Sequence, residues 1–297
     1  MIKYHYIKQS KPWGEYLSEL GWKCFYTKDN VGVYVLKTIF GGLAKVQRPY
    51  VLDVKVLDEI EVICKENRAV LVKVEPNLQQ NGKLLLERGY KLSPTPLSPS
   101  KSMYMDLGKS LDGLWRNLSR SGKYGVNRAL REGTTISCFK YPKEEMLQEY
   151  CEILKQTERR GKFVSQNSKE IRILTEVFRE KAYLFFAYTS KGALAGAKFF
   201  LGDEKVITYL NGATSRAGLE CKAGYALFWE AVRYFKQNED YKLMDLEGCY
   251  DARYPLFTKN WEGFTEFKMK FGPEVVEFPG AYVKYFSPIF KVFLGRL

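Results

Sequence analysis

Hydrophobic and polar positions follow two different periods in the first part of the chain. The runs VGVYVLKTIF (31–40) and AVLVKVEP (69–76) have the composition of strands, and VLDEIEVICKE (56–66) between them carries apolar residues at helical spacing. A second helix is predicted over 79–88, and it ends at Gly89. The first part of the chain therefore has a βαβ-like order.

A proline-rich stretch, SPTPLSPS (93–100), interrupts this pattern and predicts a connection. Beyond it, a basic segment from Ser110 to Arg131 is predicted to form one long helix that closes at Gly133. Further strands are predicted at 102–107, 134–141, 182–190, 193–201, 205–211 and 241–248, and further helices at 142–159 and 222–237. A second α/β unit is expected here. Each half holds a strand that ends in acidic residues, VKVEP and LMDLEG, which suggests a duplicated fold.

Length and composition agree with two globular domains. The chain has 297 residues, which is enough for two domains of about 150 residues each. Hydrophobic residues make up 45% and charged residues 27%, a composition that excludes a disordered chain. The net charge of +13 favours polyanionic partners such as nucleic acid, nucleotide-linked substrates or anionic lipid, although an excess of lysine can also serve solubility alone.

Several kinds of site and location are excluded by the residues that the chain lacks. None of its six cysteines stands in a CxxC spacing, which argues against a zinc site and a redox pair. Its one histidine, His5, leaves no His-based triad, and we expect a structural role for it. The N-terminus has no apolar signal-peptide core, so a cytoplasmic protein is expected. The apolar run 182–200 is interrupted by Lys191 and Lys198, which favours two strands joined by a turn over a membrane span.

The segment WRNLSRSGKYGVNRALREG (115–133) is strongly basic. Helical spacing places much of its positive charge on one face, formed by Arg120, Lys123, Arg128 and Arg131. Such a stripe can bind phosphate groups, and a solvated basic helix has the same pattern. The pattern alone leaves both interpretations open.

Two further motifs contain candidate site residues. The turn CKAGYA (221–226) resembles the Q/R-x-x-G-x-G/A turn of acyl-CoA N-acetyltransferases at Gly224 and Ala226, but Cys221 departs from it. In GFTEFKMKFGPEVVEFPGAY (263–282), the aromatic residues Phe264, Phe267 and Phe271 surround Lys268 and Lys270. A lysine between aromatic side chains can serve as a fixed positive charge, whereas an amphipathic strand with its lysines in solvent is the plain alternative.

Seven stretches together resemble the Fem family of peptidyltransferases, which build the interpeptide bridge of bacterial peptidoglycan. They are SKPWGEYLSELGW, RSGKYGVNRALREG, QTERRGKF, AGAKFFLGDEKVITYLNGAT, GYALFWEAVRYFK, MDLEGCYD and FTEFKMKFGPEVVEFPGAY. They occur in the family's order across nearly the whole chain, and the ordered set is more specific than any one member.

The resemblance implies an α/β fold of two tandem acyl-CoA N-acyltransferase (GNAT-like) domains with a cleft for the muropeptide precursor. The first domain would comprise residues 1–108 plus 273–297, and the second residues 109–272. The coiled-coil insertion of some family members is absent from this sequence. A helical arm therefore cannot be the tRNA contact.

The resemblance also implies site residues. Lys268, with Phe267 before it, matches the lysine at the family's catalytic centre, and Tyr209 matches a tyrosine near the substrate cleft. Arg160 resembles an arginine that contacts precursor phosphate, and the adjacent Arg159 offers an alternative register. The family's R-G-P-x-x-D stretch appears as Arg48, Tyr50 and Asp53 without the glycine, a departure that weakens the assignment of substrate contacts there.

The activity implied by the resemblance is transfer of an amino acid from aminoacyl-tRNA to a stem-peptide amine of a UDP-linked or lipid-linked muropeptide precursor, without a cofactor or metal. Contact with the inner face of the cell membrane is a further expectation. The attacking amine must lose a proton, and without histidine the base would be a carboxylate, the substrate or water. Asp245 and Glu247 are the candidates.

Two alternative functions stay open. One is an acyl-CoA-dependent N-acyltransferase that acts on a small amine. The other is a non-catalytic protein that binds RNA or, through YFSPIFKVFLGRL at the C-terminus, a membrane surface.

Overall fold

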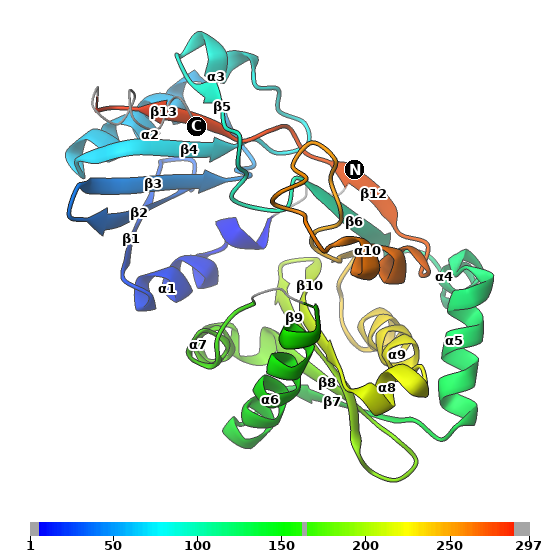
Figure 1. Cartoon of the computed structure of the whole chain (residues 1–297). Coiled ribbons are helices and arrows are strands. Elements are labelled where there is room, and N and C mark those ends of the chain that lie inside the picture. The colour runs from blue at the N-terminus through cyan, green and yellow to red at the C-terminus, as the bar shows by residue number, and fades with distance from the viewer. Residues whose placement is uncertain (1–5, 162–164, 288–297) are drawn as a thin grey trace. The chain divides into compact units, whose positions relative to one another are not determined.

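The chain forms two compact units in a computed structural model that describes residues 6–161 and 165–287 (Figure 1). The first unit is made of the described residues within Met1–Lys101, Asp251–Thr258 and Val276–Leu297. The second is made of those within Ser102–Tyr250 and Lys259–Val275. His5, the end of QTERRGKF and most of the C-terminal YFSPIFKVFLGRL lie outside the described residues.

A six-stranded sheet forms the centre of the first unit, in the order β1-β2-β3-β4-β13-β5. Its strands are β1 (Trp22–Tyr26), β2 (Gly32–Thr38), β3 (Gly41–Gln47), β4 (Ala69–Glu75), β5 (Lys91–Leu92) and β13 (Tyr282–Tyr285). β3 and β4 are parallel, and the helix α2 (Val54–Glu66) connects them, as a parallel pair requires. The other pairs are antiparallel.

Helices cover both faces of this sheet because its strands alternate their side chains. Val33 and Val35 on β2 join the core cluster that contains Ile60 of α2. Tyr34, between them, points to the opposite face, where its hydroxyl donates to the carbonyl of Lys8 at 3.0 Å, close to α1 (Lys11–Glu19). The short helices η1 (Ile7–Gln9) and α3 (Lys83–Glu87) complete the unit.

The second unit contains a seven-stranded sheet in the order β12-β6-β11-β10-β9-β8-β7. Its strands are β6 (Lys101–Asp106), β7 (Thr135–Lys140), β8 (Ala182–Tyr188), β9 (Leu194–Asp203), β10 (Val206–Thr214), β11 (Leu243–Asp245) and β12 (Glu274–Glu277). β10 pairs with β11 in parallel and with β9 antiparallel. The chain boundary at Lys101/Ser102 follows from β6, which pairs with β11 of this sheet.

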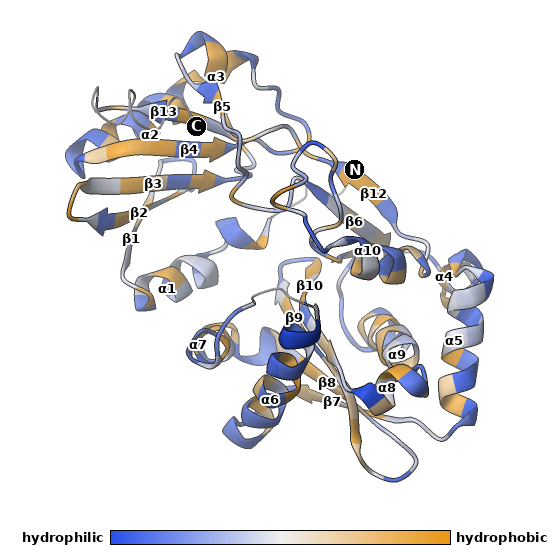
Figure 2. Ribbon diagram, viewed as in Figure 1, coloured by the Kyte–Doolittle hydropathy of each residue, from blue (hydrophilic) through white to orange (hydrophobic). Residues whose placement is uncertain are grey.

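Helices pack against this sheet on two sides (Figure 1). α9 (Ala223–Asn238) packs on β8, β9 and β10, and α5 (Arg120–Arg131) packs on α9. α6 (Glu144–Gly161) packs on β9 and β10, beside α7 (Ser168–Phe178). The remaining helices are α4 (Leu111–Asn117), α8 (Arg216–Glu220), α10 (Glu262–Met269) and η2 (Arg179–Lys181). The hydrophobic colouring of β8 and β9 agrees with their place between two helical layers (Figure 2).

Two local predictions are wrong and one is confirmed. The basic segment forms two helices, α4 and α5, because Leu118 is extended and the Ser119 side chain accepts a hydrogen bond from the Gly122 amide to start a new helix. The segment around Lys268, for which an amphipathic strand was the alternative, is the helix α10. The apolar run 182–200 forms the hairpin β8–β9, as expected. Within the described residues, none of the helices has the length and apolarity needed to cross a membrane.

Candidate active site

Lys268 is buried in the second unit, on the inner side of α10. Its side chain is 7% exposed. Its amine Nζ donates hydrogen bonds to the carbonyl oxygens of Gly248 at 2.7 Å and Glu247 at 3.2 Å. The same nitrogen lies 4.7 Å from the ring centre of Phe264 and 5.7 Å from that of Tyr209. Two carbonyls and two aromatic rings thus hold one cation in place.

The backbone that binds Lys268 follows directly from the end of β11. Asp245, the last residue of that strand, is 1% exposed, and its Oδ1 accepts hydrogen bonds from Ser102 Oγ at 2.5 Å and from the Glu247 amide at 2.8 Å. Glu247 has a left-handed backbone, with φ of +52°. This turn presents the carbonyls of residues 247 and 248 to Lys268.

A second buried lysine, Lys198 on β9, lies in the same aromatic cluster. It is 3% exposed, and its Nζ donates to Tyr209 Oη at 2.9 Å. The ring centres of Tyr209, Phe267 and Phe228 lie 4.7, 4.8 and 5.4 Å from this nitrogen. From the sequence, Lys198 was no more than an interruption of an apolar run. A lysine in the middle of a strand that helices cover on both faces was the available signal, because such a residue is rarely buried without a specific partner.

Burial shifts the pKa of all three polar groups of the cluster. Burial, and then the nearby charge of Lys268, lower the pKa of Lys198 to about 7. Burial also lowers the pKa of Lys268 to about 8, against the opposing effect of Glu247, Cys249 and Asp245. Burial raises the pKa of Tyr209 above its ordinary value. Near neutral pH, the cluster therefore offers a cation at Lys268, a readily deprotonated amine at Lys198 and a neutral phenol between them.

The structure brings Arg160 near this cluster and leaves Arg159 in solvent. Arg160 is exposed at the end of α6, and its Nη2 donates to the carbonyl of Thr214 at 2.7 Å. A Cβ atom built on Gly224, in the turn CKAGYA, would lie 3.5 Å from Thr214 Oγ1 and 3.9 Å from Phe267. The start of α9 thus lies between Thr214 and the aromatic cluster.

Three predicted substrate contacts, Arg48, Tyr50 and Asp53, lie in the first unit and have partners there. Arg48 is 2% exposed, donates to the carbonyl of Pro99 and stacks on the ring of Phe278, whose centre lies 3.4 Å away. The Tyr50 hydroxyl donates to the carbonyl of Asp29. The Asp53 side chain accepts from the Val56 amide at the start of α2. These contacts stabilise the first unit, and the role in substrate binding remains a prediction.

The basic residues of α5 differ in how they are engaged. Arg128 Nε donates to Glu132 at 2.6 Å, and its Nη2 donates to the carbonyl of Glu220 at 3.0 Å. Lys123 Nζ donates to the carbonyl of Arg116 at 3.1 Å. Arg120 and Arg131 are exposed. Arg120 is therefore more exposed to solvent than Lys123 or Arg128.

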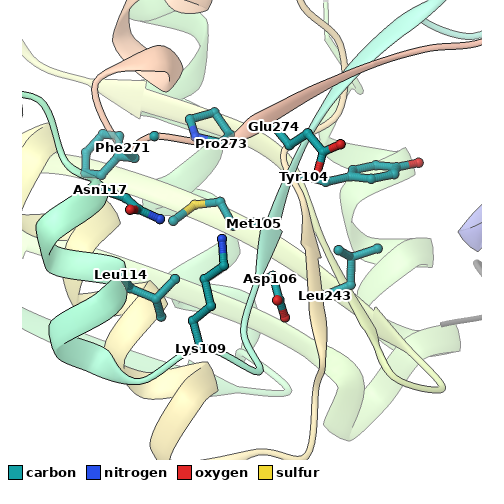
Figure 3. Close-up of a pocket in the computed structure, with 11 residues that line it drawn as sticks. Tyr104, Met105, Asp106, Lys109, Leu114, Asn117, Leu243, Phe271, Pro273 and Glu274 are labelled. Atoms are coloured by element: carbon teal, nitrogen blue, oxygen red, sulfur yellow. The ribbon is translucent and has the colours of Figure 1, made fainter. Parts of the chain in front are cut away.

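A pocket of about 250 Å³ lies between β6, α4 and the segment that follows α10 (Figure 3). Lys109 and Asn117 point toward its middle, and the Asp106 and Glu274 carboxylates stand at its side (Figure 3). Phe271, which also lines this pocket, packs on Phe228 of the aromatic cluster with ring centres 4.4 Å apart. Neither buried lysine lines it. Within residues 6–161 and 165–287, there is no group of three or more His, Cys, Asp or Glu that could hold a metal ion.

Comparison with known protein families finds a match over one part of the chain. Residues 95–195 match the sequence model of the FemAB family. The resemblance to the Fem family is confirmed. The matched segment contains α5 and α6 with Arg160, and it ends before Lys198, Tyr209 and Lys268. No curated protein sequence matches the chain.

Solved structures show a similar fold over most of the chain. The crystal structure of FemX is 17% identical, with a TM-score of 0.81 over 98% of this chain and 96% of that one. The C-terminal domain of a putative lysylphosphatidylglycerol synthetase from Agrobacterium fabrum is 12% identical, with a TM-score of 0.67 over 93% and 88%. A tandem GNAT protein from the clavulanic acid biosynthesis pathway is 12% identical, with a TM-score of 0.56 over 87% and 79%. The expected α/β fold of tandem GNAT-like units is confirmed.

Proposed function

We propose that this chain is an aminoacyltransferase that moves an amino acid from aminoacyl-tRNA to the stem-peptide amine of a peptidoglycan precursor. The observation that carries the proposal is the buried Lys268, held by two backbone carbonyls in an aromatic cluster. The FemAB match and the FemX-like fold support the same activity. The alternative of a non-catalytic RNA- or membrane-binding protein leaves the burial of two lysines in one cluster without a use.

The reaction is aminolysis of an ester, and its tetrahedral intermediate carries an oxyanion. An ammonium has three N–H donors, and Lys268 uses two of them on Gly248 and Glu247. The third is available for the oxyanion. A well-placed donor of this kind contributes about 3 to 4 kcal/mol to the stability of the transition state. Because its other two bonds already fix the lysine, little reorganisation is needed during the reaction.

Both substrates carry phosphate, and the protein has groups that attract it. The net charge of +13 raises the local concentration of polyanions. Arg160 presents a guanidinium at the end of α6, beside Thr214 and the start of α9. An arginine at this position is suited to bidentate contact with a precursor phosphate, which is the role proposed for it.

A transfer assay tests the proposal. The purified protein is incubated with a mixed pool of charged tRNAs and with either a UDP-linked or a lipid-linked muropeptide, and the products are read by mass spectrometry. The gain of one amino-acid residue on a precursor is expected, and its mass identifies the donor. If every precursor keeps its mass while the charged tRNA stays intact, the proposal is overturned.

A lipid acceptor is the second candidate, supported by the likeness to the lysylphosphatidylglycerol synthetase domain. Vesicles that contain phosphatidylglycerol therefore form a further arm of the same assay. Aminoacylated lipid without modified muropeptide would replace the peptidoglycan proposal by this one. Titration with acetyl-CoA tests the remaining enzymatic alternative, an acyl-CoA-dependent N-acyltransferase. Cys221 argues against this alternative, because it replaces the usual Gln or Arg of the acyl-CoA-binding turn. Saturable binding of acetyl-CoA would favour that alternative.

A further inference from the structure

Lys198 is a buried amine that the proposed reaction has not yet used. Among the described residues, its Nζ has one hydrogen-bond partner, the hydroxyl of Tyr209 at 2.9 Å. A charged ammonium in that position has one hydrogen-bond acceptor, whereas Lys268 has two carbonyls, so burial of the charge costs more free energy at Lys198 although both lysines lie beside aromatic rings. A neutral amine has a lone pair instead and fits the surroundings better. The site therefore favours the neutral form of Lys198.

The two buried lysines differ in what their partners can do. Lys268 is bound by carbonyl oxygens, which accept hydrogen bonds and never donate them. Lys198 is bound by a hydroxyl, which can do either. Lys268 must therefore act as a donor, whereas Lys198 can accept a proton from Tyr209. Environments that separate two titratable groups in this way are typical of an acid and base pair.

Gly212 on β10 makes room for the contact between Lys198 and Tyr209. It lies opposite Lys198 in the antiparallel register, and the register shifts between Tyr209 and Asn211. A Cβ atom at Gly212 would lie 1.9 Å from Tyr209 Oη and 3.3 Å from Lys198 Nζ. Any other residue would push the hydroxyl away. The contact therefore depends on a bulge and a glycine at one point of the sheet.

We propose that Lys198, acting through the hydroxyl of Tyr209, takes up the proton that the attacking amine loses in the aminoacyl transfer described above. This inference rests on the proposed function. It assigns the proton acceptor to a pair of residues on β9 and β10 rather than to Asp245 or Glu247.

The step balances in atoms and charge. As the acceptor nitrogen forms its bond to the ester carbonyl carbon, its proton passes to Tyr209 Oη, and the proton of Tyr209 passes to Lys198 Nζ. The carbonyl oxygen becomes the oxyanion beside Lys268. When the bond between carbon and the ribose oxygen breaks, the proton returns from Lys198 through Tyr209 to that oxygen. The products are an amide and a free ribose hydroxyl, and Lys198 is neutral again.

The charged and titratable groups around Lys198 support this direction of transfer. Tyr209 comes from β10 and Lys268 from α10, and the charge of Lys268 helps to lower the pKa of Lys198 to about 7. From α6, the fully buried Tyr150 lies near Tyr209, and burial, with Tyr209 as a smaller cause, raises the pKa of Tyr150 well above its ordinary value. α9 and β8 present Phe228 and Phe185, which carry no charge. The acidic neighbours, Asp245 and Glu247, act on Lys268, where they favour the cation.

Single-turnover rates of aminoacyl transfer test the inference with the variants Lys198→Met and Tyr209→Phe. Each is expected to slow transfer about 100-fold or more, with unchanged KM for both substrates, because loss of proton transfer affects the chemical step. The double variant should be no slower than the slower single variant, since the two residues act as a unit. Lys45→Met and Tyr183→Phe, which alter a lysine facing Trp22 and a buried tyrosine bonded to Tyr241, are the matched controls and should keep the wild-type rate.

The pH profile separates this role from a structural one. The wild-type rate should fall below about pH 7 as Lys198 becomes protonated, and Lys198→Met should lose that dependence. In Lys198→Ala, added methylamine should restore part of the rate. If Lys198→Met keeps the wild-type rate, or if its rate still falls below about pH 7, the inference about Lys198 is overturned while the proposed function stands. If Lys198→Met does not fold, Tyr209→Phe, which removes a single oxygen, decides in the same way. If the wild-type protein transfers nothing to any acceptor, both proposals fall.

Discussion

Asp245 holds the turn of backbone to which Lys268 is bound. Its Oδ1 accepts a hydrogen bond from the Glu247 amide at 2.8 Å, and the carbonyl of Glu247 accepts one from Lys268 at 3.2 Å. Ser102 Oγ donates a hydrogen bond to the same carboxylate oxygen at 2.5 Å. A carboxylate that is 1% exposed and already accepts two hydrogen bonds is well placed to orient the cation through the backbone.

The variants Asp245→Asn and Asp245→Ala distinguish this orienting role from a role as base. The amide oxygen of Asn can accept the bonds from Ser102 and Glu247, whereas Ala removes both and leaves buried donors without partners, at about 1 to 3 kcal/mol. We expect Asn to keep most of the transfer rate and Ala to lose much of it, together with thermal stability. If Asp245→Asn transfers as slowly as Asp245→Ala although its thermal stability is normal, the Asp245 carboxylate takes the proton from the attacking amine.

Lys268→Ala is expected to lower the transfer rate about 100-fold or more, because it removes the one fixed donor that faces the oxyanion. The matched control is Lys270→Ala, two residues along the chain, since Lys270 has no carbonyl partners among the described residues and should keep its rate. Circular dichroism shows whether each variant is folded. Equal rates for the two variants would remove Lys268 from the site.

The sequence alone was sufficient for elements whose signal is local. The helix α2 was predicted because a helix buried on one side shows its period in its own residues, and the strands β4, β8 and β9 were predicted because each is a short apolar run bounded by turn residues. The break at Ser119 was missed because serine occurs both inside helices and at their N-caps, and only the structure shows that its side chain caps α5. The helix α7 was also missed, although Asn167 and Glu170 form a capping box at its start.

The candidate site was predictable only in part because its contacts are not local. Lys268 was found through the aromatic residues beside it in the chain and through a family resemblance. Lys198 was not, because its contact with Tyr209 depends on the register of two strands, a bulge and the absence of a side chain at Gly212. No spacing along the chain reports such a combination. Arg48 differs from Lys198, because a motif in the sequence predicted that it binds substrate. The structure shows its contacts with Pro99 and Phe278 within the first unit.

Reversing the charge of Arg120 should weaken the binding of tRNA or of the precursor and flatten its dependence on salt. Each lost phosphate contact reduces the slope of log affinity against log salt by about one. Arg120 is the cleanest position on α5 because Arg128 is also bonded to Glu132 and Glu220, so its replacement would disturb packing as well. Filter binding over a series of salt concentrations gives the slope. Lys191→Glu, in the exposed turn between β8 and β9, is the control of equal charge, and an identical slope for both would mean that α5 is only a solvated basic helix.

Lys198→Met should stabilise the second unit, and the gain should depend on pH. Burial lowers the pKa of Lys198 from 10.5 to about 7, so between these values the unfolded chain binds more protons than the folded one. The stability of the wild type therefore rises with pH across that window, and the penalty for the lysine is largest at and below pH 7, where it is at most roughly 5 kcal/mol. The lost hydrogen bond to Tyr209 offsets about 1 kcal/mol of the gain.

Thermal melts from pH 6 to 10 should show a difference in Tm between Lys198→Met and the wild type that shrinks as the pH rises. The exposed control Lys191→Met should show no such difference. A constant difference would mean that Lys198 has an ordinary pKa in the folded protein, and its lone pair would then be unavailable at neutral pH to accept a proton from Tyr209.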